Sequence, residues 1–393
     1  MLLLDNDADK SGLVYKVEMN DKKQISKITS MDGGKPIDVV WVERTLGGHG
    51  AFATVAMEYQ DGYVKYSFKN EAGEATEGNF DAYSIRYEYD DKKKNVSMAY
   101  LYSKDGEPFD GIAQLLFTYD DKGQLEEIGF AHSNGERFPF RTRLKYDSNH
   151  KTPFPVEVAL YDMDGSLITN GYGAKTSYAY DEKGRLTEVR HFGTDEKLKI
   201  IDAKDMQGFK YGRKPTMHSF GAITKYTYEG DGRDPVKVAF FGTDEQPLAI
   251  NEKFPFASLV YTYTEEGRIA SVSTWGIDDM LSTEKGEDVA KLAYSYDSYG
   301  NVISMTSYGK YNNVVTLFKD TQFAICKNKY DDKRRETETA YFGTDGNPVN
   351  REVVIDRRIV LYHREVYEYD DGGKRIKEIY YDKDGKEVGQ KKL

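Results

Sequence analysis

Five aromatic residues each stand directly before a glycine at corresponding places in the chain, and their rings are the side chains best suited to hold a ligand. If the rings face solvent, they form a ladder that could stack on sugars or on a peptide. If they face inward, they are core rings, and the glycine beside each permits a bulge. We favour the core, and expect Trp275 to matter most to any ligand because indole offers the largest face. The set is Phe192, Phe241, Trp275, Tyr308 and Phe342.

Signatures of catalysis are absent from the sequence. The histidines are scattered, with no His-x-x-x-His pair and no Gly-x-Ser-x-Gly, which excludes the zinc-hydrolase and serine-esterase motifs. Asp and Glu are spread evenly and nominate no acid–base pair. Cys326 ends a strand-like segment and is expected to be a buried structural thiol. We therefore predict no catalytic residue and no enzyme. The histidines are His49, His132, His150, His191, His218 and His363.

Three acidic or glycine-rich segments resemble ligand loops, and each has an ordinary explanation. Asp5 to Gly12 begins like a calcium loop, but Lys10 stands where an EF-hand needs Gly and Lys16 where it needs Glu. Asp-x-Asp-Gly at 162–165 and at 382–385 is what tight turns require. Gly47-Gly-His-Gly50 lacks the lysine of a phosphate loop and is expected to be a flexible connection. We expect no metal and no cofactor.

Charge and hydropathy limit the partners. The net charge is −11, and Lys and Arg alternate with Asp and Glu, so the chain should repel a phosphate backbone and nucleic acid is not an expected partner. No apolar run of about 18 residues occurs, so no transmembrane segment is expected. Met1 to Asp5 is too short for a signal sequence, so either the protein is cytoplasmic or a leader is missing. One cysteine allows no intramolecular disulfide.

A tyrosine-rich phrase recurs along the chain, about eleven times and about every 34 residues. An apolar strand ends in Tyr-x-Tyr, an Asp-x-x-Gly turn follows, and a second strand ends in an aromatic residue. Alternation such as Leu259-x-Tyr261-x-Tyr263 is typical of a strand with one buried face, and the Asp and Gly suit a tight hairpin turn. The sequence therefore predicts antiparallel hairpins in series.

The second strand is less regular. Its apolar residues, as at Ile269 and Val272, are three apart and would lie on opposite faces of an undistorted strand. Either a one-residue bulge turns both to the same face, which we favour, or both faces are partly covered.

These features predict an all-β protein, an antiparallel β-hairpin repeat array in a coiled or spiral, solenoid-like sheet. We expect a single array over residues 1–393. The longest gap between repeats, at residues 199–217, reads as an inserted loop of the kind that carries recognition elements.

The phrase Tyr-x-Tyr-Asp-x-x-Gly-Arg-Leu-Thr, complete at 178–187 and nearly so at 294–303, resembles the YD repeat of bacterial RHS proteins. It is also similar to the bacterial variant of MORN repeats. The resemblance implies a bacterial, often surface-exposed or secreted, β-repeat scaffold; in RHS proteins the strands spiral into a shell around a toxic C-terminal segment. The period here is longer than that of a YD unit and no toxin domain follows Val388, so we do not expect a toxin-encapsulating shell.

The function we expect is a non-enzymatic scaffold that binds protein or glycan at a bacterial cell surface or after secretion. Two alternatives remain open. One is an intracellular antitoxin or immunity-type binding protein, as the MORN-like resemblance implies. The other is a carbohydrate-active enzyme whose carboxylate pair is not identified.

Overall fold

The structure is a computed structural model that describes residues 14–32, 35–36, 39–43, 48–90, 95–147, 153–169, 173–201, 220–317, 322–355, 357–370 and 373–393. In these ranges the chain forms β-strands and contains no α-helix; Asn79–Asp81 makes one 3-10 turn. The calcium-like segment 5–12, His150, His218 and most of the expected loop at 199–217 lie outside the described residues. Ile201 and Gly221, which flank that loop, form an antiparallel bridge.

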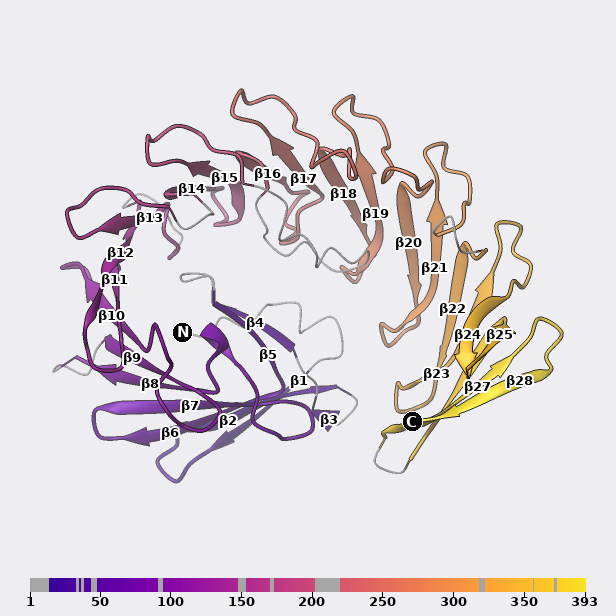
Figure 1. Ribbon diagram of the computed structural model, residues 1–393, viewed down its shortest axis with the longest axis horizontal. Helices are drawn as coiled ribbons and strands as arrows, with labels where there is room; N and C mark the ends of the chain where they lie inside the picture. The colour runs from indigo at the N-terminus through magenta and orange to yellow at the C-terminus, as the bar shows by residue number, and fades with distance from the viewer. Residues whose placement is uncertain are drawn as a thin grey trace. The chain divides into compact units, whose positions relative to one another are not determined.

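The chain divides into two compact units, Met1–Lys199 and Ile200–Leu393. In the first unit β2 pairs with β1, β3 and β6, and from β6 to β15 each strand pairs antiparallel with the next (Figure 1). β4 and β5 form a separate hairpin. The strands are β1 Val14–Met19, β2 Ile25–Asp32, β3 Lys35–Pro36, β4 Val39–Glu43, β5 Gly48–Phe52, β6 Thr54–Gln60, β7 Tyr63–Lys69, β8 Ser84–Tyr89, β9 Val96–Tyr102, β10 Gln114–Tyr119, β11 Leu125–Ala131, β12 Arg137–Lys145, β13 Glu157–Asp162, β14 Lys175–Tyr180 and β15 Leu186–Phe192.

The second unit repeats this plan. From β16 to β23 each strand pairs antiparallel with the next, β23 pairs with β26, and β27 and β28 complete the sheet. β24 and β25 form an additional hairpin between β23 and β26. The strands are β16 Ile223–Thr227, β17 Lys237–Phe241, β18 Ser258–Tyr263, β19 Ile269–Trp275, β20 Lys291–Tyr296, β21 Val302–Tyr308, β22 Ile325–Tyr330, β23 Glu336–Phe342, β24 Arg351–Ile355, β25 Arg358–Tyr362, β26 Arg364–Tyr369, β27 Arg375–Tyr381 and β28 Glu387–Lys392.

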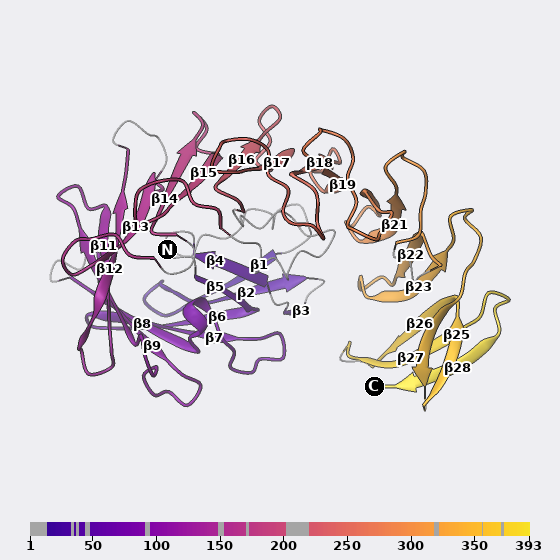
Figure 2. The same cartoon turned by 45° about the horizontal axis from the view of Figure 1, so that its top comes forward.

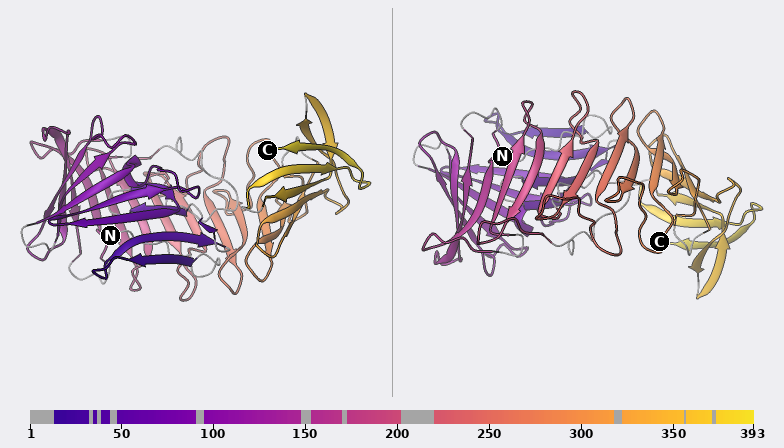
Figure 3. Two further views of the ribbon diagram at one scale, coloured as in Figure 1. Left: turned by 90° about the horizontal axis from the view of Figure 1, so that it is seen from below. Right: turned by 90° about the horizontal axis from the view of Figure 1, so that it is seen from above.

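Alternation along each first strand builds the core. Leu259 and Tyr261 are each 2% exposed, whereas Thr262 between the two tyrosines is exposed. Within each unit neighbouring strands lie side by side and are rotated progressively, so the sheet is curved (Figure 3). The predicted fold class, an all-β antiparallel hairpin array in a coiled sheet, is confirmed. The single array spanning residues 1–393 stays a prediction.

The predicted bulge is present at the hairpin turn. Thr262 pairs with Ser271, and the next residue, Tyr263, pairs with Ile269. Ala270, which lies between these two partners, is therefore the extra residue. Ile269 and Val272 therefore both reach the core, each 5% exposed. The same register shift occurs at Thr118/Tyr119, Ala179/Tyr180, Ser295/Tyr296, Lys329/Tyr330 and Glu368/Tyr369.

In six repeats the tyrosine that ends the first strand joins consecutive hairpins. Its hydroxyl donates a hydrogen bond to a backbone carbonyl where the preceding second strand starts. This explains why the position is tyrosine, because phenylalanine would fill the space but leave the carbonyl unpaired. The bonds are Tyr119 to Val96 (2.7 Å), Tyr180 to Pro155 (3.1 Å), Tyr263 to Pro235 (2.9 Å), Tyr296 to Ile269 (2.7 Å), Tyr330 to Val302 (3.1 Å) and Tyr369 to Glu336 (2.6 Å).

Turn aspartates accept backbone hydrogen bonds, as predicted. Asp120 Oδ1 accepts from the amides of Lys122 and Gln124 at 3.0 and 2.7 Å, and Gly123 closes the turn at φ 81°. Asp162 and Asp382, from the two Asp-x-Asp-Gly segments, accept backbone amides in the same way. The turn interpretation accounts for both segments.

Candidate functional site

The five predicted ligand-binding aromatics occupy one place in the repeat. Each ends a second strand and forms an antiparallel bridge with the residue six positions later. All five are half-buried on the face opposite the core, so they are neither core rings nor bare ones. The bridges are Phe192–Leu198, Phe241–Pro247, Trp275–Leu281, Tyr308–Val314 and Phe342–Pro348.

Four of the five rings are covered by a lysine of the neighbouring strand. Trp275 differs: Ser258 lies opposite it, no cation lies over its ring among the described residues, and its Nε1 donates to Ser273 Oγ at 2.9 Å. The sheet thus carries an aromatic–lysine row. In the second unit it consists of Phe241, Trp275, Tyr308 and Phe342, together with the lysines that lie over Phe241, Tyr308 and Phe342. The lysine–ring pairs are Lys175–Phe192 (5.0 Å), Lys225–Phe241 (4.8 Å), Lys291–Tyr308 (4.6 Å) and Lys327–Phe342 (4.7 Å). A ligand-binding role for these residues stays a prediction.

A polar cluster replaces the apolar core face at the end of the second unit. Leu259 and Leu292 occupy the second position of their strands, and the corresponding residue of β26 is Glu365. In the β18–β19 hairpin, Val272 pairs with the core residue Tyr261. In the β26–β27 hairpin, the residue that pairs with the corresponding tyrosine, Tyr367, is Glu378. Two glutamates therefore occupy positions that other repeats fill with apolar side chains.

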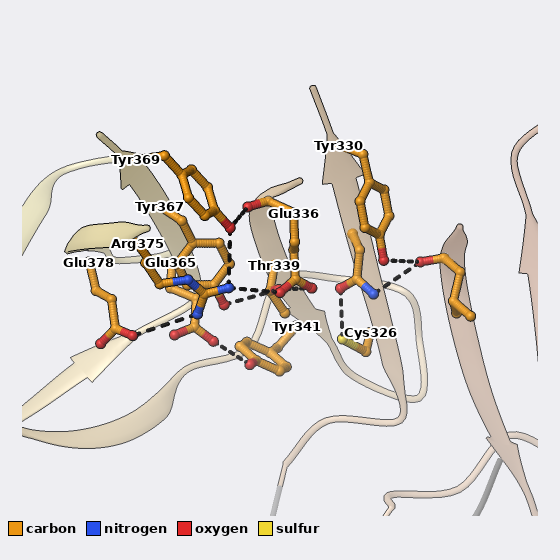
Figure 4. Close-up of polar contacts among 12 residues, drawn as sticks. Cys326, Tyr330, Glu336, Thr339, Tyr341, Glu365, Tyr367, Tyr369, Arg375 and Glu378 are labelled. Atoms are coloured by element: carbon orange, nitrogen blue, oxygen red, sulfur yellow. Dashed lines mark hydrogen bonds and ion pairs between the residues drawn. The ribbon is translucent and has the colours of Figure 1, made fainter. Parts of the chain in front are cut away.

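Tyrosine hydroxyls bind both glutamates. Tyr341 donates to Glu365 Oε1 at 2.6 Å, and Tyr380 donates to Glu378 Oε2 at 2.7 Å (Figure 4). Burial, followed by the charge of Glu365, raises the pKa of Tyr341. Burial also raises the pKa of Tyr380, with its bond to Glu378 adding to the effect. Both hydroxyls therefore stay protonated and serve as donors.

Arg375 lies between two carboxylates. Its guanidinium is 3.2 Å from Glu336 Oε2 and 3.7 Å from Glu378 Oε1, and it stacks over the Tyr367 ring at 3.6 Å (Figure 4). A second arginine, Arg351 at the start of β24, lies 4.5 Å from the centroid of the Tyr341 ring. The cluster thus combines carboxylates, phenol donors and fixed cations.

Two buried polar atoms flank the hairpin β24–β25, which adjoins this cluster. Asn350 precedes the hairpin and His363 follows it, and Asn350 Oδ1 and His363 Nδ1 have no hydrogen-bond partner in the described chain. His363 is 9% exposed and occupies a position that is Ala257, Ala290 or Ala324 in earlier repeats. Unpaired buried polar atoms of this kind are places where a ligand or water would bind.

The arrangement supplies groups that can transfer a proton and stabilise negative charge. A carboxylate takes up and returns a proton, and a positioned guanidinium stabilises negative charge as it develops. Within the described ranges no three His, Cys, Asp or Glu side chains gather in a way that could hold a metal ion. Sequence reasoning missed this cluster, although aligning the repeats by their tyrosines would have placed Glu365 and Glu378 in core positions.

The remaining candidates have structural surroundings. Cys326 is partly buried, and burial raises the pKa of its thiol to about 12, so it is not a thiolate nucleophile at neutral pH. His191 is 5% exposed, and its Nδ1 lies 3.1 Å from Thr176 Oγ1. His132 stacks on Phe138 with ring centroids 4.1 Å apart.

Curated relatives with detectable sequence similarity are bacterial nucleases, and no family model matches the chain. One is the tRNA3(Ser)-specific nuclease WapA of Bacillus spizizenii, 24% identical over 263 residues; another is the tRNA nuclease WapA of Bacillus subtilis, 24% identical over 261 residues. Each alignment covers 56% of this chain and 11% of the relative. The chain thus spans about a tenth of the length of these relatives.

Solved structures match most of the chain, but with low TM-scores and low sequence identity. The alignment with the Photorhabdus luminescens Tc holotoxin pore covers 94% of this chain and 20% of the holotoxin chain, with 10% sequence identity and a TM-score of 0.25. The alignment with the TcdB2-TccC3-Cdc42 structure covers 97% of this chain and 23% of the other chain, with 11% sequence identity and a TM-score of 0.21. A porin-like protein from Bacteroides uniformis matches 82% of this chain with a TM-score of 0.21.

The relatives' names contradict the expected function. We expected a non-enzymatic scaffold that binds protein or glycan, with an antitoxin or a carbohydrate-active enzyme as alternatives, whereas the relatives are named as nucleases of tRNA. The expectation of no enzyme is contradicted by the same names, and that of no nucleic acid conflicts with them. Net charge sums the whole chain, whereas phosphate contacts depend on local cations, so the net charge alone does not exclude nucleic acid. No helix able to cross a bilayer occurs in the part of the chain that the structure describes.

Proposed function

We propose that this protein functions as part of a tRNA nuclease of the YD-repeat kind, with its curved sheet as the repeat region. The observation that carries the proposal is the similarity to two nucleases named for tRNA, in a chain that bears the YD phrase at 178–187. Membership of the RHS-like repeat proteins forms part of the same proposal, and the YD phrase and the similarity to these nucleases support it.

The aromatic–lysine row is the feature of the sheet that suits RNA. Proteins that bind single-stranded nucleic acid combine rings, on which bases stack, with cations that follow the phosphates. Successive rings of the second unit are two strands apart, or about 10 Å at the usual strand spacing. Trp275, over whose ring no lysine of the described residues lies, would offer its ring to a base, and Lys291 and Lys327 would contact the backbone beside it.

The polar cluster, which lies on the core face and not beside the aromatic–lysine row, is where acid–base chemistry could take place. In RNA cleavage through the 2′-hydroxyl, a base takes the hydroxyl proton as its oxygen bonds to phosphorus, and an acid returns a proton to the departing 5′-oxygen. Glu365 and Glu378 are the carboxylates available for these transfers. Arg375 is the cation that would stabilise the charge on the phosphate oxygens.

Cleavage of tRNA by the purified chain tests this function. Total bacterial tRNA should be shortened on a denaturing gel, while 5S ribosomal RNA, the control, stays intact. Glu378→Gln should slow cleavage at least ten-fold, a typical effect for a proton-transfer group, and Glu387→Gln, at an exposed position of β28, should leave the rate unchanged. Intact tRNA after incubation with micromolar protein would contradict the proposal.

Binding of tRNA tests the aromatic–lysine row separately. Trp275→Ala should weaken binding of fluorescent tRNA about ten-fold or more while the melting temperature changes little, because stacking on a base contributes about 1 to 3 kcal/mol. Tyr299→Ala, which removes an aromatic side chain that is 66% exposed elsewhere in the unit, is the matched control. A large loss of stability with unchanged binding would show that the Trp275 ring contributes to packing and not to ligand binding.

A further inference from the structure

The hairpin β24–β25 is an addition to the repeat plan. Its two strands pair only with each other among the described strands, whereas the strands on either side of it join the main sheet. One face packs inward: Val353 and Ile355 contact the core formed with Tyr341 and Tyr380. β25 lies beside β28 at the end of the unit (Figure 2). The other face of the hairpin is its outer face.

The outer face is apolar and exposed. Val354 is 66%, Ile359 68% and Leu361 51% exposed. Val354 and Ile359 are cross-strand partners, and Leu361 pairs with Glu352 beside them, so the side chains are contiguous. A contiguous exposed apolar face is a typical protein-binding surface.

Opposite charges stand at the two ends of this face. Glu352 lies at the base of the hairpin and Arg357 in its turn, where it adopts φ 64°. Both side chains are exposed, and neither forms an ion pair or hydrogen bond with a described residue. The face is therefore acidic at one end, apolar in the middle and basic at the other end.

A surface with this pattern is complementary to itself. When two copies meet face to face about a two-fold axis, with the hairpins antiparallel, the base of one lies against the turn of the other. Val354, Ile359 and Leu361 then cover one another, and Glu352 of each copy meets the partner's Arg357. We propose that the chain self-associates in this way, through the outer faces of two β24–β25 hairpins.

The proposed dimer is reversible, because one hairpin face is smaller than the surface that permanent dimers bury. The self-complementary charges favour a second copy over an unrelated partner, which would need its own matching pair. The proposal does not depend on nuclease activity, because none of these residues belongs to the polar cluster or to the aromatic–lysine row.

Sedimentation velocity of the full chain over micromolar to millimolar concentrations tests the dimer. The wild type should shift from monomer to dimer as concentration rises, and Val354→Lys and Ile359→Lys should each weaken the dimer at least ten-fold. Ile277→Lys and Tyr311→Lys are matched controls, because these side chains are 63% and 92% exposed on other turns of the same unit, and they should not change the equilibrium.

Charge reversal distinguishes this geometry from non-specific association. Glu352→Arg alone and Arg357→Glu alone should each weaken the dimer, since each places like charges together. The double variant E352R/R357E should restore it. A wild type that stays monomeric throughout, a dimer unaffected by Val354→Lys, or a double variant no better than the single variants would each overturn the proposal. Far-UV circular dichroism verifies that each variant is folded.

Discussion

Acid should weaken the fold through His191, a buried histidine at the end of β15. Its side chain is on the core face, at the position that Phe240 fills in a later repeat. Burial lowers the pKa of His191 from 6.5 to about 4. In the unfolded chain the imidazole takes up its proton near pH 6.5, whereas the folded protein resists protonation down to about pH 4. Stability is therefore lost as the pH falls from about 6.5 to about 4.

The size of this loss follows from the shift. Each pKa unit corresponds to about 1.36 kcal/mol, so the full effect is about 3 kcal/mol and most of it is reached at about pH 4.5. His191→Phe removes the titrating group and replaces it with the residue that occupies the position in β17. The variant leaves the Thr176 hydroxyl without its ring partner, at a cost of about 1 kcal/mol that does not depend on pH in this range.

Urea unfolding of the wild type and His191→Phe at pH 7.5 and pH 4.5 gives the test. Carboxylates with lowered pKa, such as Asp181 and Asp331, also cost stability in acid, but they are present in both proteins and cancel in the comparison. The wild type should lose about 2 to 3 kcal/mol more than the variant between the two pH values. Parallel losses, within about 0.5 kcal/mol, would refute the assignment of His191 as a buried neutral group.

Three further predictions concern the hairpins. Tyr296→Phe should lower the free energy of unfolding by about 0.5 to 1.5 kcal/mol, because it removes the bond to the preceding hairpin, whereas Tyr299→Phe at an exposed turn position should have no effect in the same urea titration. Gly300→Val should cost about 1 to 3 kcal/mol in thermal unfolding, because the position has φ 93° and a β-branched residue is strained there; an unchanged melting temperature would contradict it. Cys326, whose thiol pKa burial raises to about 12, should react with iodoacetamide far more slowly in the native protein than in urea, and equal rates would show that the thiol is accessible.

The features of the fold that could be predicted are those that depend on residues close together in the sequence. Alternation at Leu259, Tyr261 and Thr262 determines which side chains are buried, whatever lies further along the chain. The bulge could be predicted for the same reason, because apolar residues three apart at Ile269 and Val272 can share a face only if one residue is added.

Features that depend on contacts between strands could not be predicted. Whether Phe342 is a core ring or an exposed one depends on Lys327, which comes from the paired strand and covers it. In the sequence, the hairpin β24–β25 is indicated only by the spacing between Tyr330 and Tyr369, which is longer than the usual repeat. Spacing alone does not distinguish an added hairpin from an added loop.

The polar cluster shows why a repeat protein is best searched by its departures from the repeat. A carboxylate on a solvated strand face costs little, so the many Asp and Glu of this chain carry no information singly. A carboxylate at a core position is expensive unless donors and cations surround it, so it is retained only with several partners in place. Glu365 and Glu378 meet this condition through Tyr341, Tyr380 and Arg375. Their partners come from β23 and β27, which is why residue type at a repeat position reveals the site while motif spacing along the chain does not.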